Sequence, residues 1–224
     1  MPDEVPPPFR VSSWVQEPPP SGQRAAWHRL AAGIRAVNEA LMDMDASEDD
    51  LQAAADALHQ FAENLEKTRT GRQLWGFGES APAGTTRAML DRSPIVGLGN
   101  PVAPPLTFAV DGDQVVGRGQ FGLQYEGPPN SVHGGFVAAA LDELLGMAQS
   151  LSGKAGMTGT LTVRYRKPTP LHTELTMAAR VDRVEGRKIF TTGELWAGET
   201  LCAEAEGIFI SVDFQAMFEQ QAKG

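Results

Sequence analysis

One stretch of the chain combines two glycines and a single acid in a pattern that could act on a carbonyl group. His133-Gly134-Gly135 opens an almost purely apolar segment, and Asp142 lies in that segment, nine residues after His133. Proline before this point disfavours a continuing strand, so we expect a helix to begin at the glycines. The first N–H groups of a helix have no partner inside it, and the helix dipole attracts negative charge there. A carbonyl oxygen that becomes negative during a reaction would be stabilised at this position.

The spacing of the acid suggests where it could act. Asp142 follows Gly135 by seven residues, so both lie near one face of the helix, about 10 Å apart along its axis. That distance is too long for Asp142 to act on a carbonyl held at the start of its own helix. If both groups are catalytic, we expect the carboxylate to come from a second copy of the chain, in a homodimer with shared sites.

Composition limits the classes of function. The chain has 224 residues with 42% apolar residues and a formal net charge of −9. This acidity argues against nucleic-acid binding, although a few local Arg or Lys residues could still hold a phosphate-bearing ligand. Cys202 is the single cysteine, which excludes an internal disulfide and a cysteine zinc cluster. The sequence shows no bilayer-spanning run and no signal segment at Met1-Pro2-Asp3-Glu4, so we expect a cytoplasmic protein without a membrane partner.

The N-terminal half is predicted to lie outside the main domain. Residues 1–22 are rich in proline and are expected to form an extended arm. Apolar residues recur at helical spacing over 23–43 and 48–68, with Ser47 as an N-cap, which predicts a helical hairpin extension over 23–70. Residues 71–105, with Trp75 and Phe77, are predicted to form an irregular connector.

The C-terminal half has the pattern of an α+β domain over 106–213, followed by a tail over 214–224. Two strands are expected before a helix at 134–150 and four strands after it: Leu106–Val110, Gln114–Tyr125, Thr158–Lys167, Glu174–Val184, Lys188–Ala197 and Thr200–Val212. Short turns between the strands imply antiparallel pairing. The helix is apolar nearly all round, so a curved sheet should wrap it.

This order, with the His-Gly-Gly triplet and the spaced acid, resembles the hotdog-fold acyl-CoA thioesterases, and most closely the phenylacetyl-CoA type and the human thioesterase superfamily members. The resemblance covers roughly residues 100–213. Three further segments are similar to that family: Gly127-Pro128-Pro129, Tyr165-Arg166-Lys167-Pro168 and Val184-Glu185-Gly186-Arg187-Lys188. The resemblance implies hydrolysis of an acyl-CoA thioester by a homodimer or dimer of dimers, without a metal or a cofactor other than the coenzyme A of the substrate.

Catalytic roles follow from the resemblance residue by residue. The N–H of Gly135 would polarise the thioester carbonyl, and the partner's Asp142 would serve as general base or nucleophile. Thr158 falls where the family often has a Ser or Thr near the attacking water. His133 would hold the loop or contact the carbonyl.

The resemblance also suggests binding roles. Asn130 would shape the entrance with His133, and Gly134 would bring backbone close to the substrate. Arg187 and Lys188 could contact the phosphates of coenzyme A, or they could form a solvated hairpin tip.

Two features of the pattern leave the site open. Glu143 follows Asp142, and the two side chains point about 100° apart on a helix, so only one can face the site. Asp142 is in line with Gly135, which favours it. Strand alternation also places Thr158 on the face opposite Leu161, unless a bulge at Gly159 restores it.

Two other functions remain open. One is a non-catalytic module that binds acyl-CoA or an acyl carrier, and the other is an enoyl-CoA hydratase of the same fold, which usually needs a His beside an acid. A Ser-His-Asp hydrolase is disfavoured, because the sequence lacks a Gly-x-Ser-x-Gly elbow.

Overall fold

The computed structural model describes residues 20–69, 91–154 and 156–212. Most of the predicted arm, the anchors Trp75 and Phe77, and the tail over 214–224 lie outside the described residues. The divisions predicted between arm, extension, connector, domain and tail therefore stay predictions.

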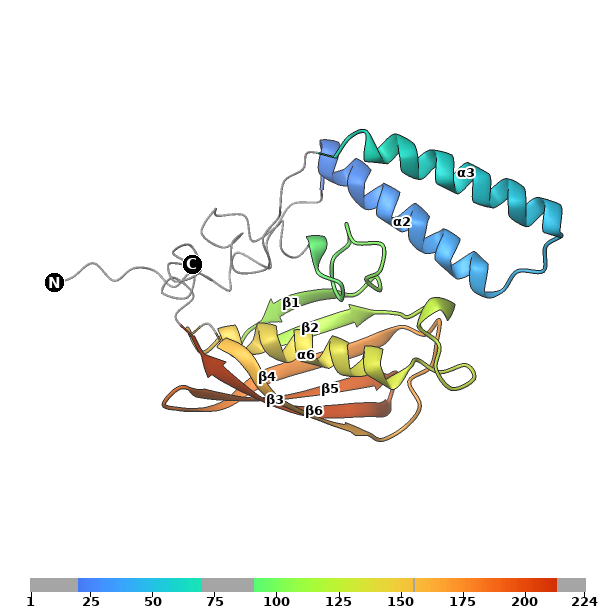
Figure 1. Cartoon of the computed structure of the whole chain (residues 1–224). Helices are drawn as coiled ribbons and strands as arrows, with labels where there is room; N and C mark the ends of the chain where they lie inside the picture. Colours follow the sequence, from blue (N-terminus) through green and yellow to red (C-terminus); the bar gives the residue numbers. More distant parts are fainter. Residues whose placement is uncertain (1–19, 70–90, 155, 213–224) are drawn as a thin grey trace.

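The fold is an antiparallel sheet curved around one long helix, as the α+β hotdog prediction required (Figure 1). In the described residues the sheet has six strands in the order β1-β2-β4-β5-β6-β3. The strands are β1 (Thr107–Asp111), β2 (Gln114–Gly119), β3 (Gly156–Tyr165), β4 (Leu175–Glu185), β5 (Lys188–Ala197) and β6 (Thr200–Ser211). The helix α6 (Gly134–Ser150) crosses one face of the sheet. β3 forms an edge of the sheet beside β6.

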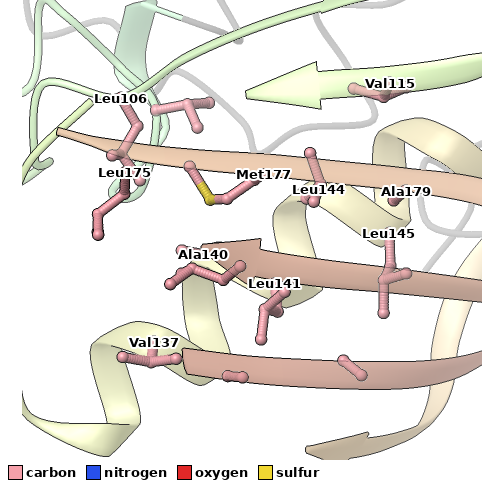
Figure 2. Packing of buried hydrophobic residues seen from close by; sticks show 14 of the residues in the cluster. Leu106, Val115, Val137, Ala140, Leu141, Leu144, Leu145, Leu175, Met177 and Ala179 are labelled. Carbon is pink, nitrogen blue, oxygen red and sulfur yellow. The ribbon is translucent and has the colours of Figure 1, made fainter. Parts of the chain in front are cut away.

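Alternation along the strands explains the packing. In β4, Leu175, Met177 and Ala179 are buried, while the alternate residues Thr176 and Arg180 are exposed and Ala178 is half-buried, as expected for a sheet with one face on the core. The buried side chains meet α6, which contributes the fully buried leucines 141, 144 and 145. Figure 2 shows these leucines between the helix and the strands. The apolar character of α6 therefore follows from its contact with most of the sheet.

The second predicted strand is wrong in its second half. β2 ends at Gly119, and Leu123–Tyr125 forms a short 3-10 helix, η1, in place of a strand. Gly119 has φ 152°, and a Cβ there would lie 2.6 Å from the carbonyl oxygen of Pro105. A glycine that admits such a close backbone approach ends the regular ladder. The remaining strand ends differ from the prediction by at most two residues.

In the part of the chain that the structure describes before the sheet, two α-helices are long: α2 (Gly22–Met42) and α3 (Glu48–Glu66). Ser47 caps α3 as predicted, because its side chain accepts a hydrogen bond from the Asp50 N–H. None of the residues of α3 is buried. No helix in the described ranges is both long and apolar enough to cross a membrane.

α2 is fixed to the segment that follows residue 90 by a buried polar cluster. Asp91, only 5% exposed, accepts hydrogen bonds from Arg24 at 2.6 and 3.0 Å and lies 2.7 Å from His28 Nε2. Farther along α2, the Arg35 guanidinium donates to the carbonyl oxygens of Leu98 and Asn100. His28 is thus a satisfied packing residue. Charged side chains hold α2 against residues 91–100 at two separate places.

The same segment covers Glu143 on α6. Ser93 Oγ donates to Glu143 Oε1 at 3.4 Å. Burial of the Glu143 carboxyl raises its pKa above the usual 4.5, and the neighbouring charge of Asp142 raises it further, while the bond from Ser93 acts in the opposite direction. Glu143 therefore belongs to the packing of residues 91–103 against α6.

Leu144→Ala should lower the free energy of unfolding by about 2–5 kcal/mol, because it leaves a cavity between α6 and the sheet. Urea denaturation followed by circular dichroism measures this change. Leu51→Ala on α3, where the leucine is 43% exposed, is the control and should cost less than about 1 kcal/mol. Equal costs at the two positions would contradict this account of the core.

Glu143→Gln should stabilise the protein more at high pH than at low pH. A carboxyl whose pKa is raised in the folded state binds more protons there than in the unfolded chain, so the wild type loses stability as the pH rises through 4.5 and the higher folded-state value. The glutamine variant lacks this loss. The unfolding free energy of Glu143→Gln minus that of the wild type should increase as the pH is raised from about 4.5 to about 8. A difference that is constant over this range would show that the carboxyl is not buried.

Candidate active site

The loop before α6 is held on both sides, which fixes the start of the helix. The His133 N–H donates to the Tyr125 carbonyl at 2.8 Å, and the Val132 N–H donates to the Thr169 carbonyl at 2.8 Å. Asn130 adopts φ 59°, a left-handed conformation that Asn tolerates better than most residues. The chain thus turns sharply at Asn130 and enters α6 from a fixed direction.

His133 is the N-cap of α6. Its Nδ1 atom accepts a hydrogen bond from the Gly135 N–H at 3.0 Å. An accepting Nδ1 places the proton of a neutral imidazole on Nε2. The Gly135 N–H, which the sequence predicts to bind the thioester carbonyl oxygen, is thus bonded to His133 of the same chain. The Gly134 N–H has no partner among the described residues.

Tyr165 closes one side of this helix start. Its hydroxyl donates to the Gly134 carbonyl at 2.8 Å, and a Cβ at Gly134 would meet the tyrosine ring at 3.4 Å. The sequence suggested Tyr165 only as part of a family-like segment, with no role of its own. The sequence did contain a signal for this position, because Tyr165 alternates with Leu161 and Val163 along β3 and is therefore expected on the face toward α6.

Asp142, in the middle of α6, lies beside Thr158, which is on β3. Thr158 Oγ1 donates to Asp142 Oδ1 at 3.0 Å. The register of β3 against β6 shifts between Thr158 and Thr160, so the extra residue is Gly159, as the bulge hypothesis required. The bulge turns the threonine toward the helix, and the hydroxyl and carboxylate form one polar pair.

Asp142 belongs to a stripe of α6 whose residues are exposed or half-buried. The stripe contains small residues and one acid: Gly135, Ala138, Ala139, Asp142 and Gly146. The residues on either side of it are mostly buried. Asp142 and the glycine start of the helix therefore face the same direction, separated by about 10 Å along the axis.

Arg187 and Lys188 are far from the glycine start within one chain. Arg187 lies in the exposed turn between β4 and β5, and Lys188 is the first residue of β5. This turn lies near the C-terminal end of α6, where Lys154 Nζ donates to the Gly186 carbonyl at 2.9 Å. The Arg187 guanidinium donates to the Ser211 carbonyl at 3.2 and 3.3 Å. The predicted site residues therefore form three groups along α6, at its start, middle and end.

Comparison with known proteins identifies this architecture. A family model described as the thioesterase superfamily matches residues 129–204. The chain is 35% identical over 96 residues to acyl-coenzyme A thioesterase THEM4 of Mus musculus, and 28% identical over 98 residues to acyl-coenzyme A thioesterase THEM5 of Homo sapiens. These matches cover 42% and 43% of this chain but only 41% and 40% of those proteins. The chain thus matches about two fifths of the length of these curated relatives.

One solved structure is similar over nearly its whole length. It is a crystal structure of a thioesterase superfamily protein, 33% identical, with a TM-score of 0.75, and the match covers 88% of this chain and 98% of that one. The similarity therefore includes the N-terminal extension as well as the sheet. On this evidence the chain belongs to the thioesterase superfamily.

Proposed function

We propose that this protein hydrolyses acyl-CoA thioesters to a free acid and coenzyme A, in sites shared by two copies of the chain. The observation that carries the proposal is the hydrogen bond from Thr158 to Asp142, an acid on the same open stripe of α6 as the glycine helix start. Names of relatives that are acyl-coenzyme A thioesterases support the substrate class.

The geometry favours a site between two helices. An axis of two-fold symmetry passing between Ala138 and Ala139 would bring Gly135 opposite the partner's Asp142, because both lie equally far along the helix from that point. The small side chains there allow two helix axes to approach within about 8–10 Å. That spacing leaves room for a thioester group between the glycine start and the partner's carboxylate. The unpaired edge of β3 would be covered in the same dimer.

In this arrangement, water would be bound by the partner's Asp142 and Thr158. The carboxylate takes a proton from the water while the water oxygen attacks the thioester carbon, and the carbonyl oxygen becomes negative. The free Gly134 N–H stabilises this oxygen, and the Gly135 N–H joins it when the His133 ring turns away. The C–S bond then breaks, and the proton on the carboxyl passes to the departing thiolate. A thiolate is a good leaving group, so the reaction needs no metal and no separate acid.

Basic residues support a site for the coenzyme. In the proposed dimer the C-terminal end of one α6 approaches the start of the other, so Lys154, Arg187 and Lys188 lie on the same side as the partner's Asn130. Their charges would attract the phosphates of coenzyme A. We place the reaction in the cytoplasm, which fits a chain whose single cysteine is unpaired and buried.

Asp142→Asn should lower kcat by about 10²–10⁴-fold, since it removes the base that activates water. Thr158→Val should lower kcat less, and Thr158→Ser should retain most activity because it keeps the hydroxyl. Release of free thiol from a panel of acyl-CoA substrates measures turnover, and circular dichroism checks the fold. Asp182→Asn, at an exposed position on β4, is the control. Full activity of Asp142→Asn would refute the proposal, and binding of acyl-CoA by the wild type without thiol release would select the binding module.

Mixed dimers test whether the site is shared. Gly135→Leu would place a side chain across the helix start, so its homodimer, like that of Asp142→Asn, should be nearly inactive. Dimers with one chain of each variant, isolated with two affinity tags, should regain about half of the wild-type activity, because one of the two sites combines wild-type groups from both chains. If each site lies within one chain, the mixed dimers stay inactive.

A further inference from the structure

Glu39 of α2 joins the N-terminal extension to the backbone that carries the proposed site. Its Oε2 atom accepts a hydrogen bond from the Leu123 N–H at 2.8 Å, across 84 residues of sequence. Its Oε1 atom lies 3.2 Å from His172 Nε2. One carboxylate therefore contacts two loops of the domain. Residue 39 lies outside the 129–204 region that the family model matches.

Each contacted loop is bonded to the start of α6. Leu123 begins η1, which ends at Tyr125, and the Tyr125 carbonyl accepts the His133 N–H at 2.8 Å. The Tyr125 ring meets the Phe136 ring edge-on, with centroids 4.9 Å apart. From Glu39 to the N-cap of α6 there is thus a short series of direct contacts.

The second loop reaches the same place from the other side. The His172 N–H donates to the Phe121 carbonyl at 2.9 Å, and one residue earlier the Leu171 N–H donates to the Asn130 carbonyl at 3.3 Å. Because Asn130 and His133 belong to one loop, both contacts of Glu39 lead to it.

The local sequence admits this contact. A Cβ at residue 122 would overlap the Oε2 atom of Glu39, so Gly122 is needed for the carboxylate to reach Leu123. α2 is also anchored by Arg24, which pairs with Asp91, and by Arg35, which donates to the Asn100 carbonyl. Glu39 is therefore not needed to keep α2 in place. Its bonds stabilise the position of η1.

We infer that Glu39 is a positioning residue, which holds η1 and thereby sets the orientation of His133 and of the Gly134 and Gly135 N–H groups at the start of α6. This inference rests on the proposed function for its effect on turnover. The geometric part, the order of the His133 loop, can be measured without substrate.

The experiment compares Glu39→Ala with Glu39→Gln, whose amide oxygen can still accept the Leu123 N–H. In Glu39→Ala the amide hydrogens of His133 and Gly135 should exchange faster than in the wild type. Its kcat should fall about 10- to 100-fold, the range that a small misplacement of reacting groups costs. Glu39→Gln should keep most of the wild-type amide protection and most of the wild-type kcat. Glu63→Ala, at an exposed position on α3, is the control for loss of a helix carboxylate and should change neither.

A mutant cycle tests whether Glu39 acts through His133. In a His133→Ala background, Glu39→Ala should cause little further loss of kcat, since the residue that it positions is absent. Gly122→Ala keeps the glutamate but displaces its carboxylate from Leu123, so it should show the same faster amide exchange and lower kcat as Glu39→Ala. It replaces Glu39→Ala in the experiment if that variant does not fold.

The outcomes separate the two proposals. Unchanged amide exchange in both Glu39→Ala and Gly122→Ala would overturn the inference, as would losses of kcat that add fully to that of His133→Ala. Full activity of Asp142→Asn would instead refute the proposed mechanism, while the exchange data would still decide the role of Glu39.

Discussion

The packing of α6 against the concave face of the sheet is the interaction on which the rest of the structure depends. The helix is buried along most of its surface, so its rotation and its depth in the sheet are fixed by the leucines at 141, 144 and 145. Once the rotation and the depth of the helix are fixed, the direction in which its open stripe points is fixed as well. The position of the Asp142 carboxylate is thus a consequence of core packing.

Two adjacent acids on this helix have different surroundings, because about 100° of rotation separates them. Asp142 bonds to the Thr158 hydroxyl beside the open stripe, whereas Glu143 is covered by residues 91–103 and its pKa is raised by burial. A raised pKa often marks a functional carboxyl, but here it marks a packing contact. The distinction comes from the neighbours of each acid and from the direction in which each points.

The three groups of candidate residues lie along a single helix, and one chain does not bring them together. A two-fold axis at the middle of α6 would bring the start of one helix beside the middle and end of another. In this view the small residues at the centre of the stripe matter as much as the charged ones, since they decide how closely two helices approach. In our proposal the extension has a complementary role, because Glu39 connects it to the loops that surround the helix start. The Asp91 cluster connects it to the segment that follows residue 90.

The sequence alone determined the elements, because apolar periodicity and glycine or proline breaks are local signals. It predicted the wrapped helix and the strands after it, while the catalytic roles that it suggested for His133, Gly135 and Asp142 stay predictions. It did not determine where the second strand ends, since the close approach of Gly119 to Pro105 joins residues that only the folded chain brings into contact. The bulge at Gly159, the hydroxyl of Tyr165 on Gly134, the cover over Glu143 and the contact of Glu39 with Leu123 were likewise decided by tertiary structure. Each depends on two segments far apart in the chain, and a one-dimensional pattern carries no information on which segments will pack together.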